Sequence, residues 1–200
     1  MFQNYHLLEQ SFNQSVSQVQ FLQQYLYDHE IRTIKELVRD LPFQKAEING
    51  SNSSQGLNFR QSSIKWIEWN DHNWWLYTKL THKLGELNKQ IWNFDLYGIN
   101  EYIQYTEYDG DASTRGHYDW HMDIGNQGIE ATRKLTMEVI LESDHRGGEF
   151  SVLMGPTEHK VNLQKGDAVI YPSYLLNKTY PVISGNRKSI ICWFSGPAFK

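Results

Sequence analysis

The stretch from residue 135 to residue 141 reads LTMEVIL, and it decides the fold because Leu135, Met137, Val139 and Leu141 occupy every second position. Alternation of period 2 is typical of a β-strand that buries one face. Comparable short runs occupy residues 92–96, 102–108, 150–154, 168–171 and 190–194. About eight such strands in roughly 105 residues predict a sandwich or jelly roll.

Two glycine-containing segments separate these runs. Gly147-Gly148 lies between two of them and predicts a hairpin, and Lys165-Gly166-Asp167 predicts another turn. Glycine adopts the backbone conformations that tight turns require without steric cost. We therefore expect antiparallel neighbours on either side of each turn.

Upstream of residue 92 the apolar period changes from 2 to about 3.6. Val16, Val19, Leu22 and Leu26 predict a surface helix over 15–29, a shorter helix is expected over 31–41 before Pro42, and 47–56 is expected to be a loop. The strongest helical stripe follows a cap at Asp71 or Asn73, and its members are Leu76, Leu80, Leu84, Leu87 and Ile91.

These patterns together predict one mainly β (α+β) domain over residues 1–200. A helical N-terminal layer over 1–91 would pack on one face of a jelly-roll core, a double-stranded β-helix, over 92–200. Two large domains are excluded by the length of 200 residues.

Composition excludes several classes of function. The net charge of −4, without runs of one sign, argues against a nucleic-acid partner, and no apolar run approaches the roughly 20 residues that cross a bilayer. A single cysteine, Cys192, rules out an intrachain disulfide framework and metal sites built on several thiolates. With no secretion signal at its N-terminus, the chain is expected to be cytoplasmic.

Residues 116–123 read GHYDWHMD and contain His-x-Asp twice, at His117/Asp119 and at His121/Asp123. Residues two apart on a strand point to the same face, so each pair offers an imidazole and a carboxylate to one metal ion. Two such pairs are a weak signal by themselves, because a strand histidine is more often a hydrogen-bonded core residue than a ligand.

The C-terminal run supplies a context for this pair. It contains Tyr171-Pro172-Ser173 and, after a loop, Pro181-Val182 followed by Gly185 and Arg187. Together with Tyr118, His121, Asp123 and Gly147-Gly148-Glu149, this run resembles the 2-oxoglutarate- and Fe(II)-dependent dioxygenases of the prolyl-4-hydroxylase type over about residues 92–196.

The resemblance implies a role for each matching residue. It implies that His121 and Asp123 bind Fe(II), because Tyr118 stands three residues before His121, and that Arg187 binds the distal carboxylate of 2-oxoglutarate. Tyr108 would help hold this cosubstrate, and Trp193 would line the pocket. Tyr118 needs a bend or bulge to reach the pocket, since strict pleating turns it away from His121.

One position departs from the family pattern. The second histidine ligand of the family falls on Asn177, ten residues before Arg187, and an amide oxygen is a weaker Fe(II) ligand than an imidazole. The implied metal ligands are therefore His121, Asp123 and Asn177. We expect hydroxylation to be impaired, whether Asn177 is an engineered change, a natural ligand variant or a mark of lost catalysis.

The implied function is the hydroxylation of an unactivated C–H bond with dioxygen as co-reactant. The substrate would be a prolyl residue in a peptide or protein, another protein side chain, or a small molecule. Two alternatives stay open: a metal-free jelly-roll module that binds peptide or sugar, and a cupin-like enzyme with a different metal. Metal content and 2-oxoglutarate binding distinguish the three.

Overall fold

The computed structural model describes residues 17–46, 59–111, 115–125 and 131–199. Its strands form two antiparallel sheets. The elements are β1 (Gln20–Leu22), α1 (Asp28–Arg39), β2 (Gln44–Lys45), β3 (Arg60–Gln61), β4 (Ser63–Ile67), α3 (Trp74–Gln90), β5 (Gly98–Ile99), β6 (Ile103–Asp109), β7 (His117–His121), β8 (Thr132–Glu142), β9 (His145–Gly147), β10 (Phe150–Met154), β11 (Thr157–Val161), β12 (Ala168–Pro172), β13 (Asn177–Thr179) and β14 (Val182–Gly196).

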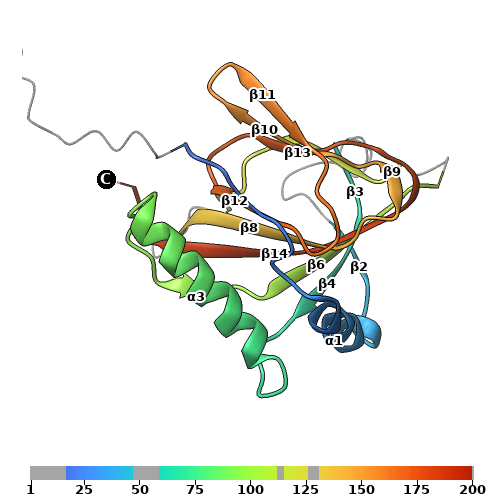
Figure 1. Cartoon of the computed structure of the whole chain (residues 1–200), viewed down its shortest axis with the longest axis horizontal. Helices are drawn as coiled ribbons and strands as arrows, with labels where there is room; N and C mark the ends of the chain where they lie inside the picture. The colour runs from blue at the N-terminus through green and yellow to red at the C-terminus, as the bar shows by residue number, and fades with distance from the viewer. Residues whose placement is uncertain (1–16, 47–58, 112–114, 126–130, 200) are drawn as a thin grey trace, which may run out of the picture.

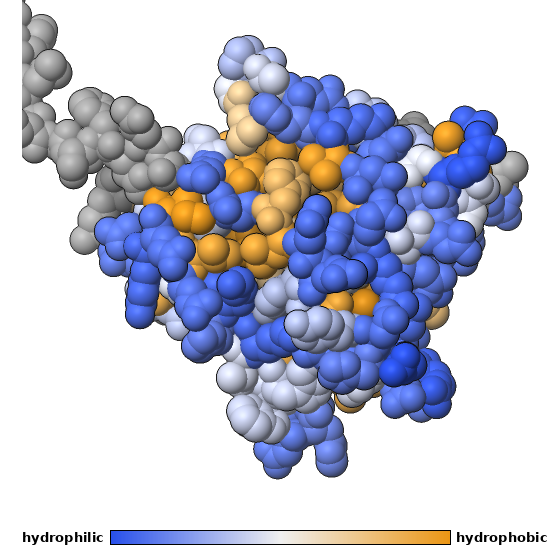
Figure 2. Space-filling view, in the orientation of Figure 1, coloured by the Kyte–Doolittle hydropathy of each residue, from blue (hydrophilic) through white to orange (hydrophobic). Residues whose placement is uncertain are grey.

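The larger sheet follows the order β1-β12-β8-β14-β6-β4-β2, and the smaller sheet follows β11-β10-β13-β7-β3. In Figure 1 the two helices lie along one side of the larger sheet, and the smaller sheet lies across its other side. Mainly β architecture with helices on one outer face confirms the fold predicted from the sequence. In Figure 2, which has the orientation of Figure 1, the apolar residues visible gather mainly above and to the left of the centre, with hydrophilic residues around them.

Side chains alternate along the strands of the larger sheet, so that one face packs against the helices and the other faces the smaller sheet. Leu135, Met137 and Val139 of β8 belong to the core shared with α1 and α3, as do Ile190 and Cys192 of β14. The intervening positions therefore point toward the smaller sheet. This second face of the larger sheet is where the candidate site is built.

Helix α3 matches its sequence prediction closely. Leu76, Leu80 and Leu84 are completely buried, as the four-residue stripe requires. Asn73 occupies the position before the helix, but its side-chain oxygen accepts a hydrogen bond from the amide of Asn70 instead of one from the helix. Asn73 therefore stands at the predicted N-cap position, but its side chain makes no capping hydrogen bond to the helix.

The helix predicted over 15–29 is wrong within the described residues. Residues 20–22 form β1, whose Gln20, Phe21 and Leu22 pair with Ile170, Val169 and Ala168 of β12. A segment at the edge of a sheet can satisfy its backbone hydrogen bonds by pairing with the neighbouring strand. The apolar periodicity of residues 15–29 carries no information about this distant partner. The helix predicted over 31–41 is present as α1, while the loop predicted over 47–56 lies outside the described residues.

Two further expectations differ from the structure. Residues 92–96 form no strand, because Asn88 at the end of α3 donates to the carbonyl of Phe94 and accepts from its amide. Gly147-Gly148 joins no hairpin, since β9 pairs with β14 whereas β10 pairs with β11 and β13. Both glycines have positive φ, which lets the chain cross from one sheet to the other.

The N-terminal part is more than a helical layer. Strands β1, β2 and β4 extend the larger sheet, and β3 extends the smaller one. The sequence turn expected at Lys165-Gly166-Asp167 is present, with the amide of Asp167 donating to the carbonyl of Gln164.

Lys65 on β4 fixes the C-terminus of α1. Its buried ammonium donates to the carbonyls of Val38, at 2.7 Å, and Arg39, at 3.3 Å. A cation at this end also interacts favourably with the helix dipole. We expect Lys65→Met to lower the free energy of unfolding by about 1.5–3 kcal/mol in urea denaturation.

Lys89→Met is the matched control for that substitution, because Lys89 is an exposed residue in the last turn of α3. Its effect should stay within about 0.5 kcal/mol. Equal effects of the two substitutions would contradict a capping role for Lys65.

Candidate functional site

A cavity of about 520 Å³ lies between the two sheets. Its lining comes from inward positions of β4, β6, β8, β12 and β14 on one side and from β3, β7 and β13 on the other. Six of the seven residues predicted from the sequence line it, namely Tyr108, Tyr118, His121, Asp123, Asn177 and Trp193. Arg187, the seventh, does not.

His121 is oriented as a metal-binding histidine should be. Its Nδ1 lies 2.7 Å from the carbonyl oxygen of Asp119, which accepts only, so Nδ1 carries the proton and donates. Nε2 is then left as the unprotonated nitrogen, 3.7 Å from Oδ1 of Asp123. Burial lowers the pKa of His121, against the opposing effect of the Asp123 charge, and favours the neutral imidazole that a metal requires.

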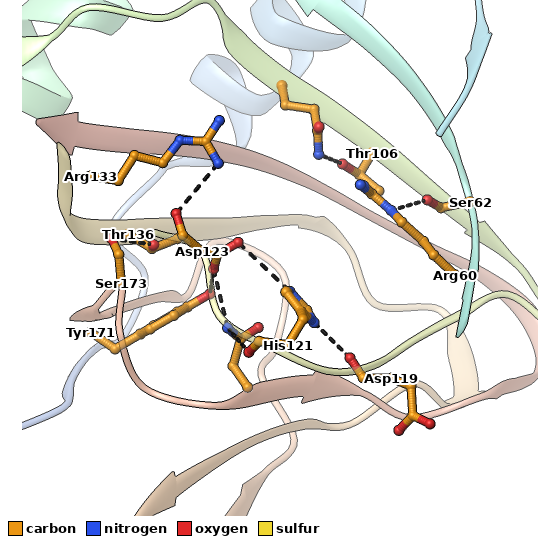
Figure 3. A network of polar contacts seen from close by, with 12 residues as sticks. Arg60, Ser62, Thr106, Asp119, His121, Asp123, Arg133, Thr136, Tyr171 and Ser173 are labelled. Carbon is orange, nitrogen blue, oxygen red and sulfur yellow. Dashed lines mark hydrogen bonds and ion pairs between the residues drawn. The ribbon is translucent and has the colours of Figure 1, made fainter. Parts of the chain in front are cut away.

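Asp123 is held from one side of its carboxylate. Its Oδ2 accepts from the hydroxyl of Tyr171 at 2.8 Å (Figure 3). The same oxygen accepts from Nδ2 of Asn177 at 3.2 Å. The other oxygen, Oδ1, faces His121. This arrangement leaves one imidazole nitrogen and one carboxylate oxygen directed toward the same space.

Asn177 presents its donor to this site. Its Nδ2 donates to the carbonyl of His121 as well as to Asp123, at 3.2 Å in both cases. Both partners are acceptors, so the amide nitrogen must be the atom that faces them. In this conformation Asn177 stabilises Asp123 through a hydrogen bond from its amide nitrogen.

Tyr118 reaches the pocket through the irregularity that the sequence required. Asn177 pairs with His121 and Thr179 with Tyr118, so two residues of β7, Asp119 and Trp120, stand opposite Lys178 alone, which is a β-bulge. The rings of Tyr118 and His121 stack with centroids 3.3 Å apart and planes 13° apart. Burial raises the pKa of Tyr118 to about 12, so the phenol is neutral near pH 7.

Arg187 does not face the cavity as the resemblance implies. Its Nη1 and Nη2 donate to Oε1 and Oε2 of Glu138 at 2.7 and 3.1 Å, and both side chains are buried. Burial by itself lowers the pKa of Arg187, but the facing Glu138 carboxylate outweighs this effect and leaves the pKa raised. Glu138, not Arg187, contributes to the cavity wall.

Trp193 lies in the cavity wall as predicted. The guanidinium of Arg133 stacks 3.8 Å from the centroid of its ring and is held by Glu101, while Nη1 lies 3.4 Å from the carbonyl of Asp123. The sequence analysis missed Glu138, Tyr171 and Arg133 as site residues. Glu138 left a signal in the sequence, because it is the one charged residue within LTMEVIL.

The residues of the cavity fit the two expected groups unequally. For Fe(II), His121 and Asp123 offer two correctly directed ligands, but the described residues contain no cluster of three His, Cys, Asp or Glu side chains that could hold a metal. For 2-oxoglutarate, the expected arginine is already paired with Glu138. The metal half of the site is therefore incomplete, and the cosubstrate half does not fit as it stands.

Comparison with known proteins finds a family model that matches part of the chain. The model that describes the 2OG-Fe(II) oxygenase superfamily matches residues 103–195. This match covers the strands that build the cavity from β6 to β14. Members of this superfamily use Fe(II) and 2-oxoglutarate.

Curated relatives are PKHD-type hydroxylases of bacteria. The chain is 35% identical over 83 residues to one from Alteromonas mediterranea, covering 38% of this chain and 37% of the relative. It is 30% identical over 87 residues to one from Colwellia psychrerythraea, covering 42% and 39%. The chain thus spans less than two fifths of the length of these relatives.

Solved structures share the fold over nearly the whole chain. A Pseudomonas putida prolyl-4-hydroxylase aligns with a TM-score of 0.70 at 16% identity, covering 91% of this chain and 94% of that one. A Trichoplax adhaerens prolyl hydroxylase, solved with a peptide of hypoxia inducible factor, gives 0.72 at 16%, with 91% and 87% covered. Residues 103–195 are therefore similar to the 2OG-Fe(II) oxygenase superfamily, and the chain shares the fold of these prolyl hydroxylase structures.

Proposed function

We propose that this chain is an Fe(II)- and 2-oxoglutarate-dependent hydroxylase whose turnover is impaired at the metal site. The observation that supports this proposal most directly is the pair His121 and Asp123, whose Nε2 and Oδ1 lie 3.7 Å apart in the cavity between the sheets. Asn177 stands where the resemblance implies the third ligand, and its amide donates to Asp123. When bound there, Fe(II) would supply the oxidative chemistry, and the protein would position its ligands and substrate.

The residues around this pair suit the positioning task. Tyr171 and Asn177 fix the carboxylate of Asp123, and the carbonyl of Asp119 fixes the ring of His121. Such outer partners orient metal ligands and are part of a working site. Tyr118, Trp193 and Met122 give the cavity apolar walls against which a substrate side chain could pack.

The proposed substrate is a peptide or protein side chain, for instance a prolyl residue, or a small molecule of similar size, with dioxygen as co-reactant. Support comes from the PKHD-type and prolyl hydroxylase relatives and from the size of the cavity, about 520 Å³. Neither described helix is sufficiently long and apolar to traverse a membrane. A cytoplasmic location remains our expectation.

A second candidate is a jelly-roll binding module without catalysis. The observation that favours it is the amide donor of Asn177, which satisfies Asp123 without any metal. Metal analysis of the purified protein separates the two candidates. Stoichiometric Fe(II) or Mn(II) supports the hydroxylase, and a metal-free protein that still binds peptide or sugar supports the module.

The choice of His-x-Asp register can be tested directly. His121→Ala and Asp123→Ala should each abolish the residual binding of Mn(II), measured by calorimetric titration. His117→Ala should leave it unchanged, because His117 does not line the cavity. The reverse pattern would place the metal at His117 and Asp119.

A further inference from the structure

Glu138 is an anomaly in its strand. Its neighbours on β8, Met137 and Val139, point into the core beneath the helices, while Glu138 points toward the cavity and is 3% exposed. A carboxylate buried to this degree requires a charged or hydrogen-bonding partner. The partner is Arg187 on the neighbouring strand β14, itself 2% exposed.

The geometry of this pair is that of a guanidinium holding a carboxylate ligand. Two nitrogens of Arg187 donate in parallel to the two oxygens of Glu138, at 2.7 and 3.1 Å. This pairing uses the end-on edge of the guanidinium, which Nη1 and Nη2 form. Tyr108 lies beside the pair, with its ring centroid 5.6 Å from the guanidinium carbon.

We propose that Glu138 acts as a built-in substitute for the distal carboxylate of 2-oxoglutarate, so that Arg187 is occupied from within the chain. This inference deepens the proposed function and rests on it for the position where the cosubstrate would bind. A dicarboxylate that enters the cavity meets the carboxylate of Glu138 before it can reach Arg187, because Glu138 and not Arg187 lines the wall.

An external carboxylate competes poorly with this internal one. Glu138 is tethered to the strand beside Arg187, which gives it a high effective concentration at the guanidinium. Displacing it would also leave its charge buried without a partner, at a cost that exceeds the gain from a similar external contact. The natural chain should therefore bind 2-oxoglutarate weakly whether or not a metal is present.

The test is to remove the internal carboxylate and offer an external one. Glu138→Ala should lower Tm by roughly 6–20 °C, since Arg187 loses its only described charge partner. Added 2-oxoglutarate or glutarate, without metal, should then raise Tm saturably and bind about 10-fold to 100-fold more tightly than to the natural chain. Titration calorimetry measures both affinities.

Two controls accompany this variant. Glu142→Ala removes another carboxylate of β8 that pairs with Lys35 outside the cavity, and it should gain no affinity for dicarboxylates. Glu138→Leu combined with Arg187→Leu removes both charges and should bind none. If Glu138→Ala does not fold, Glu138→Gln retains the side-chain volume and should show the same gain.

The outcomes separate this inference from the proposed function. Arg187-dependent binding of 2-oxoglutarate to the natural chain as tight as to the variants, or no gain in either Glu138 variant, would overturn the inference while leaving the hydroxylase proposal intact. A gain in dicarboxylate affinity together with no metal binding, even after Asn177→His, supports the inference and rejects the hydroxylase proposal.

Discussion

Arg187→Ala is expected to destabilise the protein by about 3–5 kcal/mol, because it leaves the carboxylate of Glu138 buried without its partner. Urea denaturation followed by tryptophan fluorescence measures this loss. The role that the resemblance implies for Arg187, binding of 2-oxoglutarate, does not by itself require this loss, since an arginine that only binds a cosubstrate can be removed from the free protein with little effect on stability.

The control replaces both members of the pair. Arg187→Leu combined with Glu138→Leu removes the buried charges together, and well-packed apolar residues often substitute for such a pair without net loss. We expect most of the stability to return in the double variant. A single variant as stable as the natural protein would mean that Glu138 is satisfied by another group, and the Arg187–Glu138 contact would lose its structural importance.

Asn177→His should raise the affinity for Fe(II) or Mn(II) by roughly 100-fold or more, because a ligand counts at least as much as the outer partners whose loss costs 10–100-fold. The imidazole would replace an amide whose nitrogen now faces Asp123. Anaerobic calorimetric titration measures the change. Asn177→Ala is the control, and equal affinities of the His and Ala variants would show that the third ligand lies elsewhere.

Turnover should require a second substitution. The sequence alone leads us to expect succinate release from Asn177→His by itself, since Arg187 and the surrounding motif are present. Because Arg187 is occupied by Glu138, we expect robust release only when Asn177→His is combined with Glu138→Ala. Full turnover from the single variant would contradict the occupied state of Arg187, and none from the double variant would count against the hydroxylase proposal.

The fold was predictable wherever a local pattern has one physical reading. LTMEVIL could satisfy its alternation only as a strand with one face in a core, and the leucine stripe of α3 only as a helix packed on that core. The candidate site residues His121, Asp123, Asn177 and Trp193 were implied by the family resemblance, and all four line the cavity. Tyr118 followed too, together with the bulge that it needs.

Only the tertiary structure decided where these groups find their partners. Residues 20–22 left their helical pattern because β12 offered a free edge, and no local signal records a partner about 150 residues away. Arg187 was assigned to a ligand because an arginine in a motif does not reveal which carboxylate it meets. Glu138 is 49 residues distant in the chain, and strand pairing alone brings the two charges together in a buried site, where a charge without a partner is unstable.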